Sequence, residues 1–151
     1  MQITNKDIPR VGPETPGGQW LRRYWMPVGL ASELHDIPQA LQIMGEALVL
    51  FRDGEGRIGL LGQHCAHRGA SLEYGDVESA GIRCPYHGWL YDVDGKCLEQ
   101  PSEKGGKEFC AKVRQVSYPV RELGGLIFTF MGPNAENPPP LPNYSPLIDH
   151  G

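Results

Sequence analysis

Short runs of alternating apolar and polar residues follow one another along much of this chain. Leu41–Ile43 and Ala47–Phe51 are the first two runs, and Arg57–Leu61 follows across a turn at Asp53-Gly54. Side chains alternate between the two faces of a strand, so runs of this kind separated by Gly-containing turns predict antiparallel strands. The first half of the chain is therefore expected to contain strands joined in hairpins.

The second half continues the same pattern. Trp89–Tyr91 and Lys96–Leu98 flank Asp94-Gly95, which is typical of another hairpin. Val113–Val120 alternates again, and Leu126–Phe130 is apolar almost throughout, which is typical of a central strand. The prediction is an all-β fold made mainly of antiparallel strands.

One short helix is predicted near the N-terminus. Thr15 can cap it, Pro16 suits its first position, and the helix must end before Pro27. One face of this helix carries the apolar residues Trp20, Leu21 and Tyr24. We expect that face to pack against the domain, with Arg22 and Arg23 in solvent. The alternative for Trp20 and Trp25 is a contact surface for another domain.

Two segments are expected to lack regular structure. Gln100–Lys112 is polar and Gly-rich, which predicts a surface loop with solvated lysines at Lys104, Lys107 and Lys112. Asn134–Pro146 contains five prolines, and a run this rich in proline predicts an extended linker rather than a central strand or a helix. Residues 1–133 are therefore assigned to one domain and residues 134–151 to a linker toward a domain that this sequence does not contain.

Composition narrows the class of protein. The chain has 151 residues, 40% of them hydrophobic, which suits one domain with its own core. The formal net charge of −4 argues against a nucleic-acid partner, which would need a basic face. Met1–Asp7 lacks an apolar core of the kind found in signal peptides, and the longest mostly apolar run, Leu123–Met131, is too short to cross a bilayer. We expect a cytoplasmic protein that does not contact membranes.

The candidate chemistry lies in two Cys/His pairs. Cys65-x-His67 and Cys84-x-x-His87 are separated by sixteen residues. Two thiolates and two imidazoles can close a tetrahedral zinc site, or they can hold a [2Fe–2S] cluster with both Cys on one iron and both His on the other. Spacing alone leaves both interpretations open. The other two cysteines, Cys97 and Cys110, have no His at ligand spacing and are interpreted as buried apolar groups or free thiols.

The flanking residues favour the cluster. Cys65–Leu72 and Cys84–Trp89 closely resemble the Rieske signature of ring-hydroxylating oxygenase α subunits. The resemblance to the phthalate-dioxygenase-like branch covers nearly the whole chain, including Arg22–Val28, Tyr91–Cys97, Tyr118–Glu122 and Met131–Pro133. It implies a Rieske-type iron–sulfur fold with two cluster-binding loops, and it implies a [2Fe–2S] cofactor.

The same resemblance implies the roles of individual residues. The four cluster ligands would be Cys65, His67, Cys84 and His87. A surrounding set that tunes the cluster would be Arg68, Gly69, Gly88, Trp89 and Tyr91. Tyr91 stands where respiratory Rieske proteins have a Tyr that donates to a cysteine sulfur, but Trp89 stands where they have a Ser donor. With one donor missing, a low reduction potential is expected. Arg68 could instead form an ion pair with Glu73 or Asp76.

The resemblance also implies an electron path. His67 is the candidate edge for electron entry, and His87 would pass electrons toward a mononuclear Fe(II) held by two His and one carboxylate in a separate catalytic domain. His64 is interpreted as a bystander. The implied partners are an NAD(P)H-dependent flavin or iron–sulfur reductase or a ferredoxin, and the catalytic domain of the same or a neighbouring subunit, within a homotrimer. The chain alone is expected to lack oxygenase activity.

Two other function classes compete with this Rieske oxygenase component. A stand-alone Rieske ferredoxin would carry electrons without a substrate of its own, but such ferredoxins resemble only the central part of this chain. Here about forty residues precede the first hairpin and a Pro-rich tail follows the last strand, which matches the oxygenase layout. A structural zinc module is the non-redox alternative.

Overall fold

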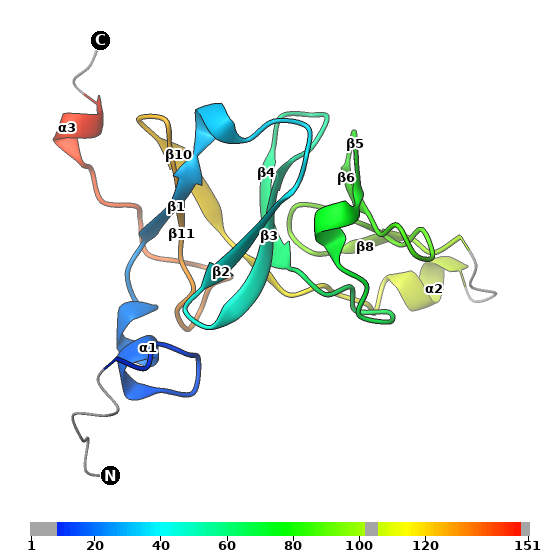
Figure 1. Cartoon of the computed structure of the whole chain (residues 1–151), viewed down its shortest axis with the longest axis horizontal. Coiled ribbons are helices and arrows are strands. Elements are labelled where there is room, and N and C mark those ends of the chain that lie inside the picture. The colour runs from blue at the N-terminus through cyan, green and yellow to red at the C-terminus, as the bar shows by residue number, and fades with distance from the viewer. Residues whose placement is uncertain (1–8, 102–105, 149–151) are drawn as a thin grey trace.

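The computed structural model describes residues 9–101 and 106–148, and three antiparallel sheets make up its framework. One sheet has the order β2-β3-β4-β9, with strands Gln39–Ile43, Glu46–Arg52, Ile58–Gly62 and Ser117–Tyr118. A second has the order β1-β11-β10, with strands Met26–Leu30, Leu126–Thr129 and Val120–Leu123. The third has the order β5-β6-β7-β8, with strands Asp76–Glu78, Gly81–Arg83, Leu90–Tyr91 and Cys97–Glu99. Figure 1 shows the third sheet at one end of the molecule.

The expected all-β fold is confirmed, and the expected hairpins form. β2 pairs with β3 in a register that places Leu41 opposite Leu48, and β3 pairs with β4 so that Leu50 faces Leu60. β11 lies at the centre of its sheet, as its apolar run predicts. The β5–β6 hairpin was not expected, because each of its strands has only three residues and shows no clear alternation.

β3 supplies apolar side chains to two separate cores. Val49 and Phe51 point into one core, whereas Leu48 and Leu50 point into another, and all four side chains are fully buried. Alternate residues of a strand face opposite sides, so a continuously apolar strand can join two layers. The Val49/Phe51 core lies against the β5–β8 sheet and contains Cys65 and Cys84. Both candidate ligand cysteines are therefore packed in the core to which β3 contributes Val49 and Phe51.

The predicted N-terminal helix forms as α1 (Pro16–Leu21). The Thr15 side chain accepts a hydrogen bond from the Gly18 N–H at 3.1 Å, and Pro16 occupies the first turn. The expectation that its apolar face packs against the domain is wrong. Trp20 is 60% exposed and Tyr24 is 55% exposed, and their rings meet edge to face at 5.2 Å. A helix of six residues is too short to present a continuous stripe to a core, so only local ring contact remains.

Trp25, in contrast, is buried. Its indole N–H donates to the Pro139 carbonyl at 2.8 Å, and its ring lies 5.8 Å from that of Phe130. Phe128 also stacks on Tyr144. These contacts place residues after Asn134 against the β1-β11-β10 sheet. The last element of the described chain is the short helix α3 (Ser145–Ile148). The role of residues 134–151 as a linker stays a prediction.

Arg22 is not in solvent as expected. It is 6% exposed, forms an ion pair with Glu46 and donates to the Met44 carbonyl at 2.9 Å. The other Glu46 oxygen accepts from the Tyr118 hydroxyl at 2.6 Å. Burial, together with this hydrogen bond, raises the pKa of Tyr118 to about 12. The three side chains fasten α1 to the β2-β3-β4-β9 sheet. Arg23 is exposed, as expected.

The segment Gln100–Lys112 is not wholly a loop. Gly106–Cys110 forms the helix α2, and the Cys110 side chain is 4% exposed. Residues 102–105, with Lys104, lie outside the described residues, as do residues 1–8 and 149–151; Lys112 is exposed as expected. Two single-turn 3-10 helices, Ala31–Glu33 and Leu72–Tyr74, complete the fold. None of the helices within the described ranges has the length and apolar character that a bilayer crossing demands.

Candidate iron–sulfur site

The first ligand loop (residues 63–71) connects β4 to the 3-10 helix at Leu72–Tyr74. The Cys65 N–H donates to the Ala70 carbonyl at 2.9 Å, and the Gly69 N–H donates back to the Cys65 carbonyl at 2.8 Å. Gly69 has φ of 73°, in the left-handed region that favours glycine. The loop is therefore a closed turn that holds Cys65 at its base.

The second ligand loop (residues 84–89) connects β6 to β7 and repeats this frame. The Cys84 N–H donates to the Trp89 carbonyl at 2.8 Å, and the Gly88 N–H donates to the Cys84 carbonyl at 3.1 Å. Gly88 has φ of 74°, nearly the value of Gly69. Each loop thus has a Cys at its start and a glycine four residues later, with His67 and His87 between them. The sequence spacing of the two pairs reflects two copies of one turn.

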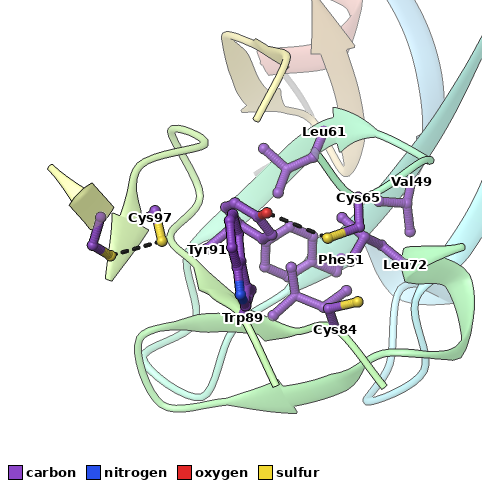
Figure 2. Packing of buried hydrophobic residues seen from close by; sticks show 11 residues of the cluster. Val49, Phe51, Leu61, Cys65, Leu72, Cys84, Trp89, Tyr91 and Cys97 are labelled. Carbon is purple, nitrogen blue, oxygen red and sulfur yellow. Dashed lines mark hydrogen bonds between the residues drawn. The ribbon is translucent and has the colours of Figure 1, made fainter. Parts of the chain in front are cut away.

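The two cysteines of these loops come together in the core beside β3. Cys65 and Cys84 are each 3% exposed, and Figure 2 shows both side chains within the same apolar cluster. Burial raises the pKa of the Cys84 thiol, backbone hydrogen bonds from Tyr86 and His87 oppose this shift, and the neighbouring Cys65 thiol adds to it. A metal ion would reverse this balance, because a coordinating thiol is deprotonated.

Tyr91 contacts the sulfur of Cys65 from β7. Its hydroxyl lies 3.3 Å from the Cys65 sulfur, along the dashed line in Figure 2, and the residue is fully buried. The pKa of Tyr91 is raised, first by burial and then by the hydrogen bond to Cys65. The hydroxyl therefore stays protonated and can donate to a thiolate sulfur, which is the role that the resemblance assigned to it.

The two imidazoles form a second pair. The rings of His67 and His87 lie 4.7 Å apart, and both residues are half-buried. His67 stacks on Trp89 with the rings 4.3 Å apart and 4° from parallel, and His87 lies against Tyr86 at 3.8 Å. In the part of the chain that the structure describes, the buried Nδ1 of His87 has no hydrogen-bond partner. An unpaired buried nitrogen is costly unless a metal occupies it, so this atom fits a ligand role.

The four side chains are thus arranged as a pair of thiols and a pair of imidazoles. A Rieske cluster needs two Cys at one iron and two His at the other. The pairing therefore fits the [2Fe–2S] group.

A buried glutamine, which the sequence did not single out, clamps the first ligand loop. The Gln115 side chain accepts from the Ala66 N–H at 2.8 Å and donates to the carbonyls of Gly62 and His64 at 2.7 and 2.8 Å. It is 5% exposed. No local pattern marks Gln115, because it lies about fifty positions from the loop that it holds.

Arg83 clamps the second ligand loop in the same manner. It donates to the Gly88 carbonyl at 2.6 Å, and it is itself held by Glu78 and Glu99 at 2.5 and 2.7 Å. The two carboxylates raise the Arg83 pKa further above its usual value, chiefly through the hydrogen bond to Glu78. In the sequence, only the position of Arg83 directly before Cys84 indicates that it could hold this loop.

The remaining predicted site residues lie at the rim. Arg68 is exposed, and neither of its proposed ion pairs, with Glu73 or Asp76, forms among the described residues. Glu73 instead accepts from the Gln63 side chain at 3.0 Å. His64 is exposed, and its Nδ1 lies 3.3 Å from the Gly69 carbonyl. A tuning role for Arg68 stays a prediction.

Comparisons with known proteins agree with this arrangement. Residues 24–119 match the family model described as "Rieske [2Fe-2S] domain". The chain is 55% identical over 139 residues to the phenoxybenzoate dioxygenase subunit alpha of Ectopseudomonas oleovorans, covering 92% of this chain and 34% of that protein. It is 43% identical to the phthalate 4,5-dioxygenase oxygenase subunit of Pseudomonas putida, covering 88% and 31%. The chain spans about a third of the length of these curated relatives.

Solved structures show the same fold. Dicamba monooxygenase matches with a TM-score of 0.76 and 30% identity, over 87% of this chain and 42% of that one. The oxygenase in the reduced complex with ferredoxin of carbazole 1,9a-dioxygenase matches with a TM-score of 0.64 and 29% identity, over 82% and 33%. The match to the family model covers more than half of the residues, including both ligand loops. The chain therefore belongs to the Rieske [2Fe-2S] domain family.

Proposed function

We propose that this chain is the electron-transfer domain of a non-haem iron oxygenase component, with Cys65 and Cys84 bound to one iron and His67 and His87 to the other. The observation that carries the proposal is the separation of the four side chains into adjoining thiol and imidazole pairs on two matching loops. When bound, the cluster takes up and releases one electron at a time. The 55% identity to an oxygenase subunit favours this role over that of a stand-alone ferredoxin.

The chain's own side chains would keep the site dry and oriented. Trp89, which is 3% exposed, covers His67 with its ring and limits how that imidazole can rotate. Tyr91 holds a proton toward the Cys65 sulfur. Gln115 and Arg83 fix the two loops from outside, which lowers the reorganisation that each change of charge requires. The half-buried imidazoles leave an edge of the site near the surface, where electrons would enter and leave.

The electron donor we propose is a ferredoxin or an NAD(P)H-dependent flavin or iron–sulfur reductase. The related carbazole 1,9a-dioxygenase oxygenase forms a complex with ferredoxin, which supports a donor of this kind. We infer entry at His67 and exit through His87 to a mononuclear Fe(II) in a catalytic domain of the same or a neighbouring subunit, in a homotrimer, with residues 134–151 as the linker. A cytoplasmic location belongs to this proposal, because the described cysteines are all free thiols.

The reduction potential is expected near the low end of the Rieske range, about −150 mV rather than about +300 mV. Trp89 offers no hydroxyl to the site, and Tyr91 is left as the side-chain donor expected at a sulfur. Tyr91→Phe should lower the potential by about 40 mV, because a hydrogen bond to sulfur favours the reduced state by roughly 1 kcal/mol. Trp89→Ser should raise it. Protein-film voltammetry measures the reduction potentials of the wild type and of both variants. A wild-type potential near the upper end of the Rieske range would contradict the role given to these hydrogen bonds.

The chain should bind about two irons and should not oxygenate an aromatic acid by itself. It has five His in all, two of them assigned to the cluster, and the remaining three are His35, His64 and His150. No two of these have the close spacing of a facial triad. Dithionite or a ferredoxin should bleach the visible absorption, and air should restore it without hydroxylated product. Iron analysis with single-turnover product assays tests this; three irons per chain, or product from this chain alone, would refute the assignment.

A further inference from the structure

Two cysteines outside the ligand loops face each other in the core. Cys97 on β8 and Cys110 at the end of α2 are 5% and 4% exposed, and their sulfurs are 2.7 Å apart. The dashed line at Cys97 in Figure 2 marks this contact. No local pattern pairs them, because thirteen positions separate them and neither adjoins a His.

The distance between the two sulfurs is close to that of a bond. A disulfide has a sulfur–sulfur distance of about 2.05 Å, so closure requires a small movement of the two side chains. Burial, together with the neighbouring Cys110 thiol, raises the pKa of Cys97 to about 12. Cys97 is therefore a neutral thiol at neutral pH, and because the thiolate is the form that reacts with an oxidant, the pair rests in the reduced state and closes slowly.

Cys97 and Cys110 adjoin residues that contact the side chains around the proposed ligands. Cys97 is opposite Tyr91 across the β7–β8 pairing, and Tyr91 contacts the Cys65 sulfur. Phe109, which precedes Cys110, meets the Trp89 ring edge to face at 6.3 Å. A covalent link between the two cysteines would thus fasten α2 to the layer that holds both a thiol ligand and an imidazole ligand in place.

We propose that Cys97 and Cys110 form a redox-active pair that hydrogen peroxide closes to a disulfide, fastening α2 to β8. Peroxide oxidises one thiol to a sulfenic acid and leaves as one water. The second sulfur then attacks the first, the sulfur–sulfur bond forms, the sulfur–oxygen bond breaks, and a second water leaves. Each sulfur loses one electron, the peroxide bond accepts both, and both thiol protons end in water. Peroxide is small enough to reach sulfurs that larger disulfide reagents cannot contact.

Peptide mapping of the cluster-loaded chain tests the pairing. The chain is treated with peroxide at doses that leave its visible absorption unchanged, then alkylated in denaturant and digested with trypsin. The four cysteines fall on four different tryptic peptides, residues 58–68, 84–96, 97–104 and 108–112. We expect peptides 97–104 and 108–112 to be joined, with the loss of two hydrogens, and to separate on reduction with dithiothreitol. Separate alkylation of both peptides after peroxide, or irreversible sulfinic acid at either, overturns the proposal.

Two controls sharpen the test. In Cys110→Ser and in Cys97→Ser the joined peptide should be absent, and the cysteine that remains should accumulate a sulfenic acid in at least one of the two variants, trapped by dimedone added with the denaturant. A remaining cysteine that stays unmodified in both variants counts against the chemistry. A link between peptides 58–68 and 84–96 would report loss of the cluster, and its absence shows that the ligand cysteines were protected. Closure should also raise the thermal midpoint of the wild-type chain but not that of Cys110→Ser. A link without this rise would contradict the fastening of α2.

Discussion

Cys84→Ala should yield a chain with no visible chromophore and no bound cluster. The substitution removes one of two thiolates from an iron, and no other sulfur among the described residues lies in its place, since Cys97 is paired with Cys110. Cys65→Ala, His67→Ala and His87→Ala should have the same effect, because each removes a ligand that its loop holds in a fixed turn. Visible absorption and iron content after reconstitution measure the loss, which should be complete.

Neighbouring residues of the same type provide matched controls. His64→Ala changes the imidazole next to Cys65, but that ring is exposed and directed at the Gly69 carbonyl, so the chromophore should remain. Cys97→Ala and Cys110→Ala remove the other two thiols and should also keep it. If Cys97→Ala or His64→Ala bleached the chain while Cys84→Ala did not, the assignment of ligands would be wrong.

Glu46→Ala should destabilise the fold by about 3–5 kcal/mol, because it leaves the buried Arg22 charge without its partner. The same carboxylate also accepts the Tyr118 hydroxyl, so this half-buried donor loses its acceptor as well. The midpoint of urea unfolding, followed by far-ultraviolet circular dichroism and by the fluorescence of the buried Trp25, measures the change.

The control for this loss is Glu122→Ala, which removes an ion pair of the same type at the surface. Arg52 and Glu122 lie 3.6 Å apart with side chains 29% and 44% exposed, and such pairs contribute about 0–1 kcal/mol. Tyr118→Phe should fall between the two variants, because it removes one hydrogen bond and leaves the ion pair intact. Equal effects of Glu46→Ala and Glu122→Ala would show that the buried network has no special role.

The parts of this fold that sequence could predict are those governed by neighbouring residues. The turn at Asp53-Gly54 and the alternation of the strands around it depend on contacts within a few positions, and the hairpin formed as expected. Thr15 was recognised as a cap because a capping bond spans only three residues. The resemblance named the family for a related reason, since the Cys, His and Gly positions of each loop lie within a single turn, in which the backbone at Gly69 and Gly88 favours glycine.

What the sequence did not reveal depends on residues that meet only in the folded chain. Arg22 was expected in solvent because a pair of arginines usually is, and its burial follows from Glu46 on β3 and Tyr118 on β9. Trp20 was expected in the core and is exposed, because α1 ends too soon to be covered. In both residues the tertiary environment, not the type of side chain, decided burial.

The sequence by itself determined the ligand types, their spacing and the two glycine-containing turns, because these are properties of segments of four to six residues. The tertiary structure decided that the thiols adjoin each other and the imidazoles adjoin each other, that Gln115 holds the first ligand loop, and that Cys97 meets Cys110. Each of these depends on how the layers pack against the sheet that contains β3. Contacts across such layers are set by packing and buried hydrogen bonding over the whole domain, which no local pattern records.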